Sequence, residues 1–257
     1  MTYIYQPRLY RRLFNNRDFH FFDVCIGESD LCIGIELAKS ASHFNEEIQV
    51  KYAAGLVRKL RSELEKYIRS QPLFLTSLEP VEPLTGAPDI AVRMCLAAHI
   101  AGVGPMAAVA GAIAETVGRA ILDHDKDIAG VIVENGGDIF VKTTRPLKVG
   151  ISAGGSPLSG KIALEIEPID TPEGICTSSA TVGHSLSLGN ADAALIVAGD
   201  AFLADAAATT LGNMIRCKDD LSTSVNSIMK IKGIKGALAV MGDKMSAIGQ
   251  IKLVPVI

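Results

Sequence analysis

The sequence predicts an α+β fold in which a mainly antiparallel sheet packs against helices. Apolar, strand-like segments occur in pairs near both ends and in the middle of the chain, with helical patterns between the pairs. This order differs from the regular strand–helix alternation of a parallel sheet. The 257 residues, 48% of them hydrophobic, are enough for a large core. We expect one domain over residues 1–257, with an N-terminal hairpin and helix in 1–71 and a core in 89–257.

The first strand pair is expected in residues 19–36, with a polar turn between the strands. A long amphipathic helix follows, which Asn45 can cap and which Glu46 and Glu47 favour in its first turn. Four prolines in residues 72–88 then indicate a connector. The expected buried face of the helix consists of apolar residues four apart: Ile48, Tyr52, Leu56, Leu60, Leu64 and Ile68.

Residues 95–114 form an apolar run of membrane-spanning length. Gly102 and Pro105 interrupt the run near its middle, and proline is favoured at the first position of a helix. We therefore expect two buried helices, at about 89–101 and 105–123, and no membrane span.

Most of the remaining chain reads as further strands. Asn135, Gly136 and Gly137 favour a tight hairpin turn between two apolar runs. The expected elements are a strand–turn–strand unit at 128–143, strands at 146–154, 160–168 and 192–199, a helix at 200–215, and a closing hairpin made of 236–243 and 248–256.

Charge and cysteine content exclude several classes of protein. A net charge of −3 argues against nucleic acid as the main ligand. The dense basic run of Arg8, Arg11, Arg12 and Arg17 fits a solvated N-terminal arm. Five scattered cysteines without a CxxC spacing argue against a disulfide framework and the common zinc sites. Without an apolar signal segment, the chain is expected to be cytoplasmic.

Residues 174–187, "GICTSSATVGHSLS", combine a thiol, several hydroxyls and a histidine. Cys176 precedes Thr177, Ser178 and Ser179, and nearby hydrogen-bond donors lower the pKa of a thiol toward the reactive thiolate. A loop could bring His184 back to Cys176 as a catalytic partner. The alternative is a buried structural cysteine and an ordinary loop histidine, because cysteine is commonly buried for packing.

Asp205 and Thr209 are four residues apart in a predicted helix and therefore share one face. A carboxylate and a hydroxyl so placed can both reach Mg²⁺, which prefers oxygen ligands. Spacing alone favours the simpler alternative, in which the aspartate is exposed and the threonine hydroxyl donates a hydrogen bond to a backbone carbonyl of the same helix.

Two glycine-rich segments could approach a ligand. Residues 134–139, "ENGGDI", allow close contact with backbone, although a hairpin turn alone explains them. Residues 101–115 contain neither a dinucleotide fingerprint nor a P-loop. They could still present helix N-terminal amides to an anion at Met106–Ala108, or could serve close helix packing through small residues.

The order of these motifs resembles the ApbE-like superfamily, whose best-known members are the FAD:protein FMN transferases. The resemblance rests on "GVGPMAAVAGAIAE", "NGGDI", "GICTSS" with a downstream "GHSLS", and "LADAAATTLGN". It covers residues 90–257 strongly and is closer to a cytoplasmic branch found in archaea and anaerobic bacteria. It implies a T-fold-related structure of antiparallel sheet and paired helices.

The resemblance also implies site residues. In the transferases the aspartate and threonine of the last motif hold Mg²⁺ at the FAD pyrophosphate, which implies Asp205 and Thr209 as metal ligands here. FAD or FMN is the implied cofactor. The chain lacks the Asp and Lys of the transferase motif "DLGG-x-AKG", and Ala180 replaces a glycine usual in the branch. The expected ligand-binding set is Gly104, Met106, Asn135, Gly136, Gly137, Asp138, Thr177, Ser178 and Ser179.

Three functions follow from this resemblance and these motifs. The branch is linked to sulfide assimilation and homocysteine formation, which implies Cys176 as a thiolate or persulfide carrier with His184 as its base or charge partner. The alternatives are a Mg²⁺-dependent FAD-binding or FMN-transferase-like enzyme, and a non-catalytic small-molecule-binding protein. Expected partners are a small-molecule substrate, a sulfur-transfer protein and further copies of this chain, because apolar content is high and edge hairpins are available.

Overall fold

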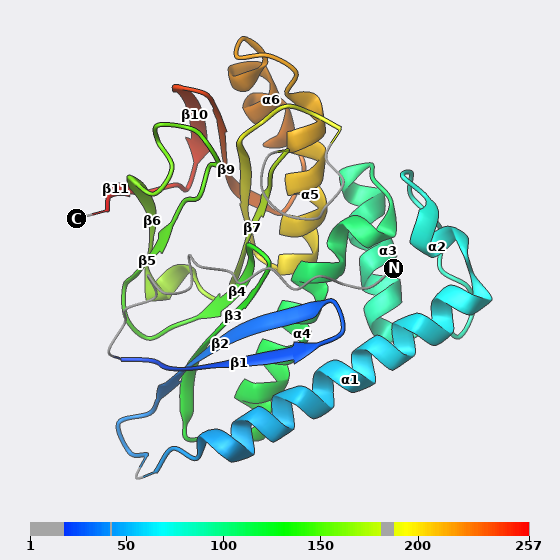
Figure 1. Ribbon diagram of the computed structural model, residues 1–257, viewed down its shortest axis with the longest axis vertical. Helices are drawn as coiled ribbons and strands as arrows, with labels where there is room; N and C mark the ends of the chain where they lie inside the picture. Colours follow the sequence, from blue (N-terminus) through cyan, green and yellow to red (C-terminus); the bar gives the residue numbers. More distant parts are fainter. Residues whose placement is uncertain (1–17, 42, 181–187, 257) are drawn as a thin grey trace.

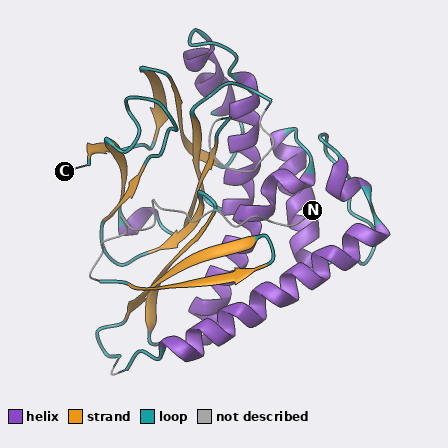
Figure 2. Cartoon of the chain, in the orientation of Figure 1, coloured by secondary structure: helices purple, strands orange, loops and turns teal. Residues whose placement is uncertain are grey.

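The computed structural model describes residues 18–41, 43–180 and 188–256, and these form three layers. The central layer is an eight-stranded antiparallel sheet with strand order β1-β2-β3-β4-β7-β8-β9-β10. Helices cover one face of this sheet, and a three-stranded sheet of order β11-β6-β5 covers the other (Figures 1 and 2). The predicted α+β class with mainly antiparallel sheet is confirmed.

The expected elements occur in the expected order, and the structure adds helices at 73–76 and 220–228 and strands at 173–178 and 244–249. They are β1 (His20–Ile26), β2 (Ser29–Leu37), α1 (Glu46–Ser70), α2 (Leu73–Thr76), α3 (Asp89–Ala101), the 3-10 helix η2 (Pro105–Ala108), α4 (Val109–His124), β3 (Ile128–Asn135), β4 (Asp138–Lys142), β5 (Leu147–Gly150), β6 (Ile162–Ile166), the 3-10 helix η3 (Pro168–Asp170), β7 (Glu173–Ser178), β8 (Ala193–Ala198), α5 (Ala201–Met214), α6 (Asp220–Ile228), β9 (Ile234–Met241), β10 (Lys244–Gly249) and β11 (Leu253–Pro255).

The large sheet separates two hydrophobic cores. Successive side chains of a strand point to opposite faces, so each buried strand contributes to both cores. In β7, Ile175 packs between the two sheets, whereas Cys176 packs under the helices with Phe140 of β4. This alternation decides which side chains can meet at the candidate site.

The N-terminal hairpin and helix form as predicted, but the buried face of α1 is displaced. The Asn45 side chain accepts a hydrogen bond from the Ile48 amide at 3.1 Å and so caps the helix. The predicted face is correct at Leu60 and Leu64, whereas Ile48 is 55% exposed. A series of residues four apart rotates by about 40° per step, so it drifts off the core-facing side. The buried residues are Gln49, Ala53, Ala54, Val57, Leu60, Leu64 and Tyr67.

The apolar run after the connector folds as two helices, as predicted. Gly102 ends α3 with a positive φ of 74°, and Pro105 begins η2 and α4. Among the described residues, the stretch Pro105–His124 is the one helix long and apolar enough to cross a membrane by length and composition. Within the fold, 56% of its apolar window is buried against the rest of the protein, as in a core helix.

The predicted closing hairpin is wrong in its second strand. β9 pairs with β10, which begins at Lys244 directly after the tight turn at Gly242 and Asp243. Leu253–Pro255 instead pairs with β6 in the small sheet. The polar residues of β10 concealed it, because an edge strand with mostly exposed side chains lacks the alternating apolar pattern. Helix α6 was also missed.

Helices α4 and α5 approach each other closely at Gly111. A Cβ atom there would lie 2.2 Å from the Ala201 carbonyl oxygen, which is backbone and cannot rotate away. We expect Gly111→Ala to lower the free energy of unfolding by about 2 kcal/mol, measured by urea denaturation. Gly55→Ala is the matched control, because Gly55 also lies inside a helix but has nothing within 4 Å. It should stabilise by about 1 kcal/mol, and a similar loss in both variants would contradict the explanation.

Candidate functional site

The candidate site begins at the turn between β3 and β4. Gly136 and Gly137 have positive φ values of 75° and 102°, and Asn135 pairs with Asp138 to close the turn. The Gly137 amide donates to Glu134 Oε1 at 2.8 Å. Asn135 Nδ2 donates to the Ala110 carbonyl oxygen at 3.2 Å, which ties the turn to the start of α4.

The segment expected to be a polar loop is partly a strand. β7 runs to Ser178 beside β4, and the Thr177 amide donates to Asp138 Oδ1 at 3.3 Å. Strand alternation places the Thr177 side chain on the face of the sheet opposite to Cys176. Ser178 is buried, and the Ser179 hydroxyl donates to the Asp192 carbonyl oxygen at 2.7 Å. The three hydroxyls therefore do not share one surface, as a loop would have allowed.

Asp205 lies on the sheet-facing side of α5 and is buried, so the alternative of an exposed aspartate is wrong. Its Oδ2 accepts a hydrogen bond from the Gly111 amide at 2.8 Å, in the first turn of α4. The carboxylate thus caps a neighbouring helix, whose own N-cap residue provides no side-chain hydrogen bond.

Two buried carboxylates, Asp138 and Asp205, are close enough to interact electrostatically. Burial raises the pKa of Asp205 to about 7, although the Gly111 and Ala110 amides act in the opposite direction. Burial and the nearby Asp205 charge raise the pKa of Asp138 well above its ordinary value. Two neighbouring carboxylates in a low-dielectric setting cannot both ionise easily, so the site favours a bound cation or retained protons.

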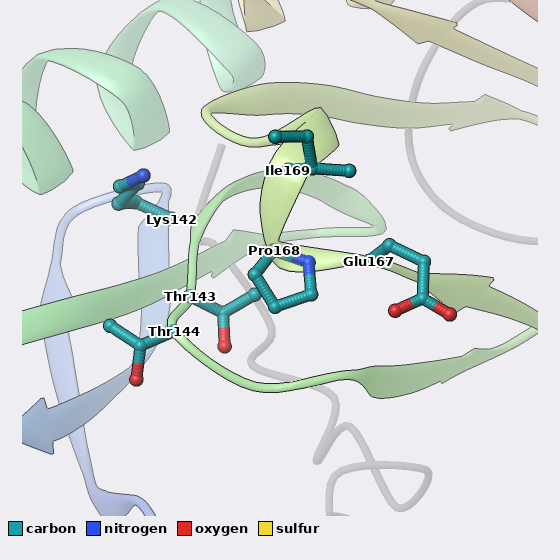
Figure 3. A pocket seen from close by; sticks show the side chains of 6 residues that line it. All are labelled: Lys142, Thr143, Thr144, Glu167, Pro168 and Ile169. Atoms are coloured by element: carbon teal, nitrogen blue, oxygen red, sulfur yellow. The ribbon is translucent and has the colours of Figure 1, made fainter.

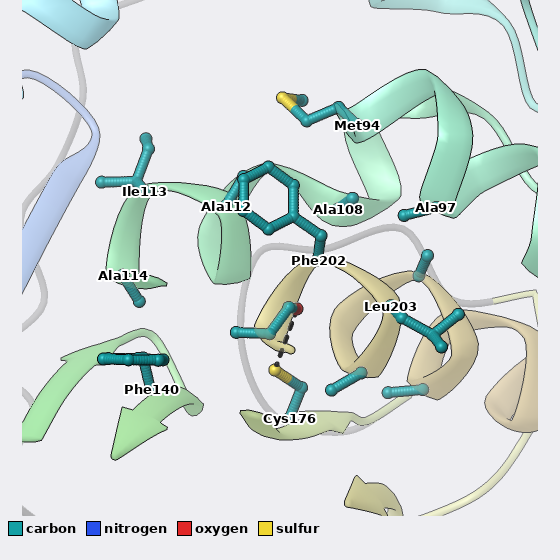
Figure 4. Packing of buried hydrophobic residues seen from close by; sticks show 14 of the residues in the cluster. Met94, Ala97, Ala108, Ala112, Ile113, Ala114, Phe140, Cys176, Phe202 and Leu203 are labelled. Atoms are coloured by element: carbon teal, nitrogen blue, oxygen red, sulfur yellow. Dashed lines mark hydrogen bonds between the residues drawn. The ribbon is translucent and has the colours of Figure 1, made fainter. Parts of the chain in front are cut away.

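Cys176 lies in the interior beside these carboxylates, with no exposed surface. Its Sγ contacts the Ala201 carbonyl oxygen at 3.7 Å, and buried side chains such as Phe140 and Phe202 surround it (Figure 4). Burial, followed by the charges of Asp138 and Asp205, raises the pKa of the thiol well above its ordinary value. The expectation of surroundings that lower this pKa is therefore wrong, because the neighbouring groups are acids and carbonyls rather than cations.

The other predicted residues occupy different positions. Thr209 is half-buried one turn after Asp205 on α5. Gly104 is a packing position, because a Cβ there would lie 1.8 Å from the Ser77 carbonyl oxygen. Met106 is half-buried against the core in η2. His184 lies outside the described residues, so its pairing with Cys176 stays a prediction.

Sequence reasoning missed Glu115, which holds the two site helices together. Its side chain is completely buried, and its Oε1 accepts from Arg93 at 2.9 Å and from Arg119 at 2.8 Å. Its Oε2 accepts from the amide of Ala201, the first residue of α5, at 2.6 Å. The one sequence signal was a glutamate within an otherwise apolar helical run.

A surface hollow lies at the opposite end of β4 from Asp138. It is a shallow, open depression of about 760 Å³ (Figure 3). Ile169 at its border is 90% exposed, and Lys142 Nζ is already engaged by the Thr171 carbonyl oxygen at 3.4 Å. Neither Asp138 nor Asp205 lines it. Its lining residues are Lys142, Thr143, Thr144, Glu167, Pro168 and Ile169.

The donor set at Asp205 fits a cation that takes few protein ligands. The described part of the chain holds no group of three or more His, Cys, Asp or Glu side chains arranged for a metal ion. Mg²⁺ does not need such a group, because it commonly binds one or two carboxylates together with water and substrate phosphates. Asp205 and Thr209 would be the protein ligands, and the cation would supply charge neutralisation at a phosphate.

Comparisons with known proteins agree with this fold. A family model described as "AbpE bacteria" matches residues 11–231. A UPF0280 protein of Methanocella arvoryzae is 47% identical over 195 residues, which cover 76% of this chain and 78% of that protein. A UPF0280 protein of Methanocaldococcus jannaschii is 42% identical over 206 residues, covering 78% and 82%.

Solved structures of flavin transferases have a similar fold at low identity. A mutant of the flavin transferase ApbE from Vibrio cholerae superposes with a TM-score of 0.61 at 11% identity, covering 90% of this chain and 97% of that one. The ApbE protein of Thermotoga maritima gives 0.57 at 11% identity, covering 89% and 96%. At such identities the likeness concerns the fold alone.

Proposed function

The chain belongs to the family described as AbpE bacteria, and from this premise we propose that it binds a flavin nucleotide together with a divalent cation. The observation that carries the proposal is Asp205, a buried carboxylate with a pKa raised to about 7, one helical turn before Thr209. Such a group gains most from a cation, because the cation compensates a charge that burial disfavours.

The surrounding backbone supports a nucleotide at this place. The Gly136–Gly137 turn has no Cβ atoms and lies beside the strand that carries Thr177. Asn135 fixes this turn to the start of α4, and Asp205 fixes the same start to α5. The β3–β4 turn, the start of α4 and helix α5 are thus held together by hydrogen bonds. Ligand sites are usually preformed in this way, with their polar groups fixed by the surrounding fold.

Binding is proposed here rather than flavin transfer. The transferase motif that carries an Asp and a Lys corresponds to residues 101–115, and this segment has neither residue. Its described part packs closely through small side chains, with Gly111 against Ala201.

A titration with FAD and with FMN, with and without Mg²⁺, tests the proposal. We expect flavin to bind at least tenfold more tightly in Mg²⁺ than in EDTA, a difference of about 1.4 kcal/mol. Asp205→Asn and Thr209→Val should each remove this dependence on Mg²⁺, whereas Asp243→Asn, which changes an exposed carboxylate, should retain it. No flavin binding by the wild type in the presence of Mg²⁺ would refute the proposal.

We also propose a second candidate, sulfide or persulfide handling for homocysteine formation, which the position of Cys176 beside Asp138 favours. The Cys176 thiol would pass its proton to Asp138, and its thiolate would attack the terminal sulfur of a donor persulfide, releasing the donor thiol. A sulfur-transfer protein would be the donor. The burial of Cys176 requires α5 to move away from β7 before this reaction.

Thiol accessibility separates the two candidates. In the native protein we expect Cys25 and Cys217, which are exposed, to react readily with an alkylating reagent, whereas Cys176 reacts only after denaturation. Mass spectrometry of the alkylated peptides measures this directly. Rapid native modification of Cys176, or its persulfidation by a donor, would favour the sulfur function over simple binding.

A further inference from the structure

Exposed apolar side chains are concentrated in α2, the connector and α3. Among the described residues, fourteen large hydrophobic side chains are exposed, and seven of them lie between residues 73 and 100. We call this set the α2–α3 surface. Its members are Leu73, Leu75, Leu78, Leu84, Val92, Leu96 and Ile100.

Helix α3 forms the centre of the surface. Its inner side packs into the helical core through residues such as Met94 and Ala97 (Figure 4), while Val92, Leu96 and Ile100 form a stripe on its outer side. Helices that are hydrophobic on all sides are normally buried on all sides. The interior of one chain buries only the inner side of α3.

The connector continues the surface beside this stripe. Glu82 lies 3.9 Å from His99 Nδ1, so the chain between α2 and α3 runs along the outer side of α3. Exposed fractions of 39% to 64% on the seven side chains leave on the order of 600 Å² of apolar surface. This is at the upper end of the roughly 300–600 Å² of the largest apolar patch on a typical monomer, and it approaches the roughly 800 Å² per partner of a stable interface.

We propose that the α2–α3 surface joins two copies of this chain. A two-fold interface sets one patch against itself, so exposed charges near its centre would face like charges. Among lysine, arginine, aspartate and glutamate, residues 90–101 contain a single residue, Arg93. Its side chain pairs with the buried Glu115. The exposed side chains there are Val92, Leu96, His99 and Ile100, so the stripe on α3 itself presents no carboxylate, lysine or arginine to its own copy, and Glu82 of the connector lies beside it at His99.

Sedimentation equilibrium of the full chain tests this proposal. The wild type is expected at twice the 27.1 kDa chain mass, and Leu96→Glu at the mass of one chain. Ile100→Glu, at the end of the same stripe, should also dissociate the dimer. Ile169→Glu is the matched control, because Ile169 is equally apolar and 90% exposed but lies on η3, away from this surface.

Circular dichroism and thermal unfolding establish that the variants fold. A monomeric wild type at about 100 µM would overturn the proposal and leave the surface to a different protein. A dimer that survives both Leu96→Glu and Ile100→Glu would overturn it as well. The inference is independent of flavin binding, since both variants should keep the Mg²⁺-dependent flavin affinity of the wild type if that function is correct.

Discussion

Asp205→Asn is expected to raise the free energy of unfolding of the ligand-free protein by about 3 kcal/mol at pH 8. The pKa of this buried carboxyl is raised from 3.8 to about 7 in the folded protein. Ionising it above pH 7 therefore opposes folding, and the difference between a pKa of 3.8 and one of about 7 corresponds to about 4 kcal/mol. Asparagine retains an oxygen that can accept the Gly111 hydrogen bond, so most of this gain should appear.

The stability difference between the wild type and Asp205→Asn is expected to depend on pH. Between about pH 4 and pH 7 the folded protein retains a proton that the unfolded chain has lost, so wild-type stability falls as pH rises through this window. Asp205→Asn should lose the contribution of Asp205 to this slope and keep only that of Asp138, so the stability of the variant should fall less steeply with pH and the two proteins should converge toward pH 4. Urea denaturation at several pH values measures both curves.

Two results would contradict the assignment. One is an equal stability of wild type and Asp205→Asn at pH 8, and the other is a difference that persists unchanged at pH 4. Asp243→Asn is the control of opposite sign, because a hydrogen bond from Lys218 lowers the pKa of that exposed carboxyl. Addition of Mg²⁺ at pH 8 should stabilise the wild type and leave Asp205→Asn unchanged, if Asp205 is a cation ligand.

The predictable parts of the fold are those that local chemistry decides. Asn135–Gly136–Gly137 favours one tight turn, and Gly102 followed by Pro105 favours a break between helices. Local sequence patterns do not show which distant segments pair with each other. Leu253 follows an apolar pattern that suits β9 as well as β6, and the actual choice depends on where the chain turns after Gly249.

The candidate site shows the same division. The motif order indicated that Asp138, Cys176 and Asp205 belong to one place, and the structure brings these three side chains together. Their chemical state depends on burial, which arises when α5 closes over β7. Gly174 permits this closure, because a Cβ there would lie 2.4 Å from the Ala201 Cα. No local pattern in residues 174–187 could show that a helix covers the cysteine.

Glu115→Gln is expected to lower the free energy of unfolding by about 3 kcal/mol, because it weakens charge-assisted hydrogen bonds from two arginines and from the Ala201 amide to a buried carboxylate. The glutamine amide group would face the guanidinium of Arg93 or Arg119 instead of accepting its hydrogen bond. For a chain of this length we expect the melting temperature to fall by about 6 to 12 °C. Thermal unfolding followed by circular dichroism measures this loss.

The matched control for this substitution is Glu47→Gln. Glu47 also pairs with a cation four residues away, Lys51 at 2.6 Å, but both side chains are about three-quarters exposed. Glu47→Gln should lower the free energy of unfolding by less than about 0.5 kcal/mol. Equal losses in the two variants would show that burial does not strengthen the Glu115 pairs.

Glu115 also links stability to the site. Its Oε2 holds the first amide of α5, and Asp205 lies one turn further along the same helix. Glu115→Gln should therefore weaken Mg²⁺-dependent flavin binding at temperatures where the variant remains folded, whereas Glu47→Gln should not. If a folded but destabilised Glu115→Gln protein binds flavin as the wild type does, Glu115 contributes to stability only. The hydrogen bond from the Gly111 amide would then be sufficient to position Asp205.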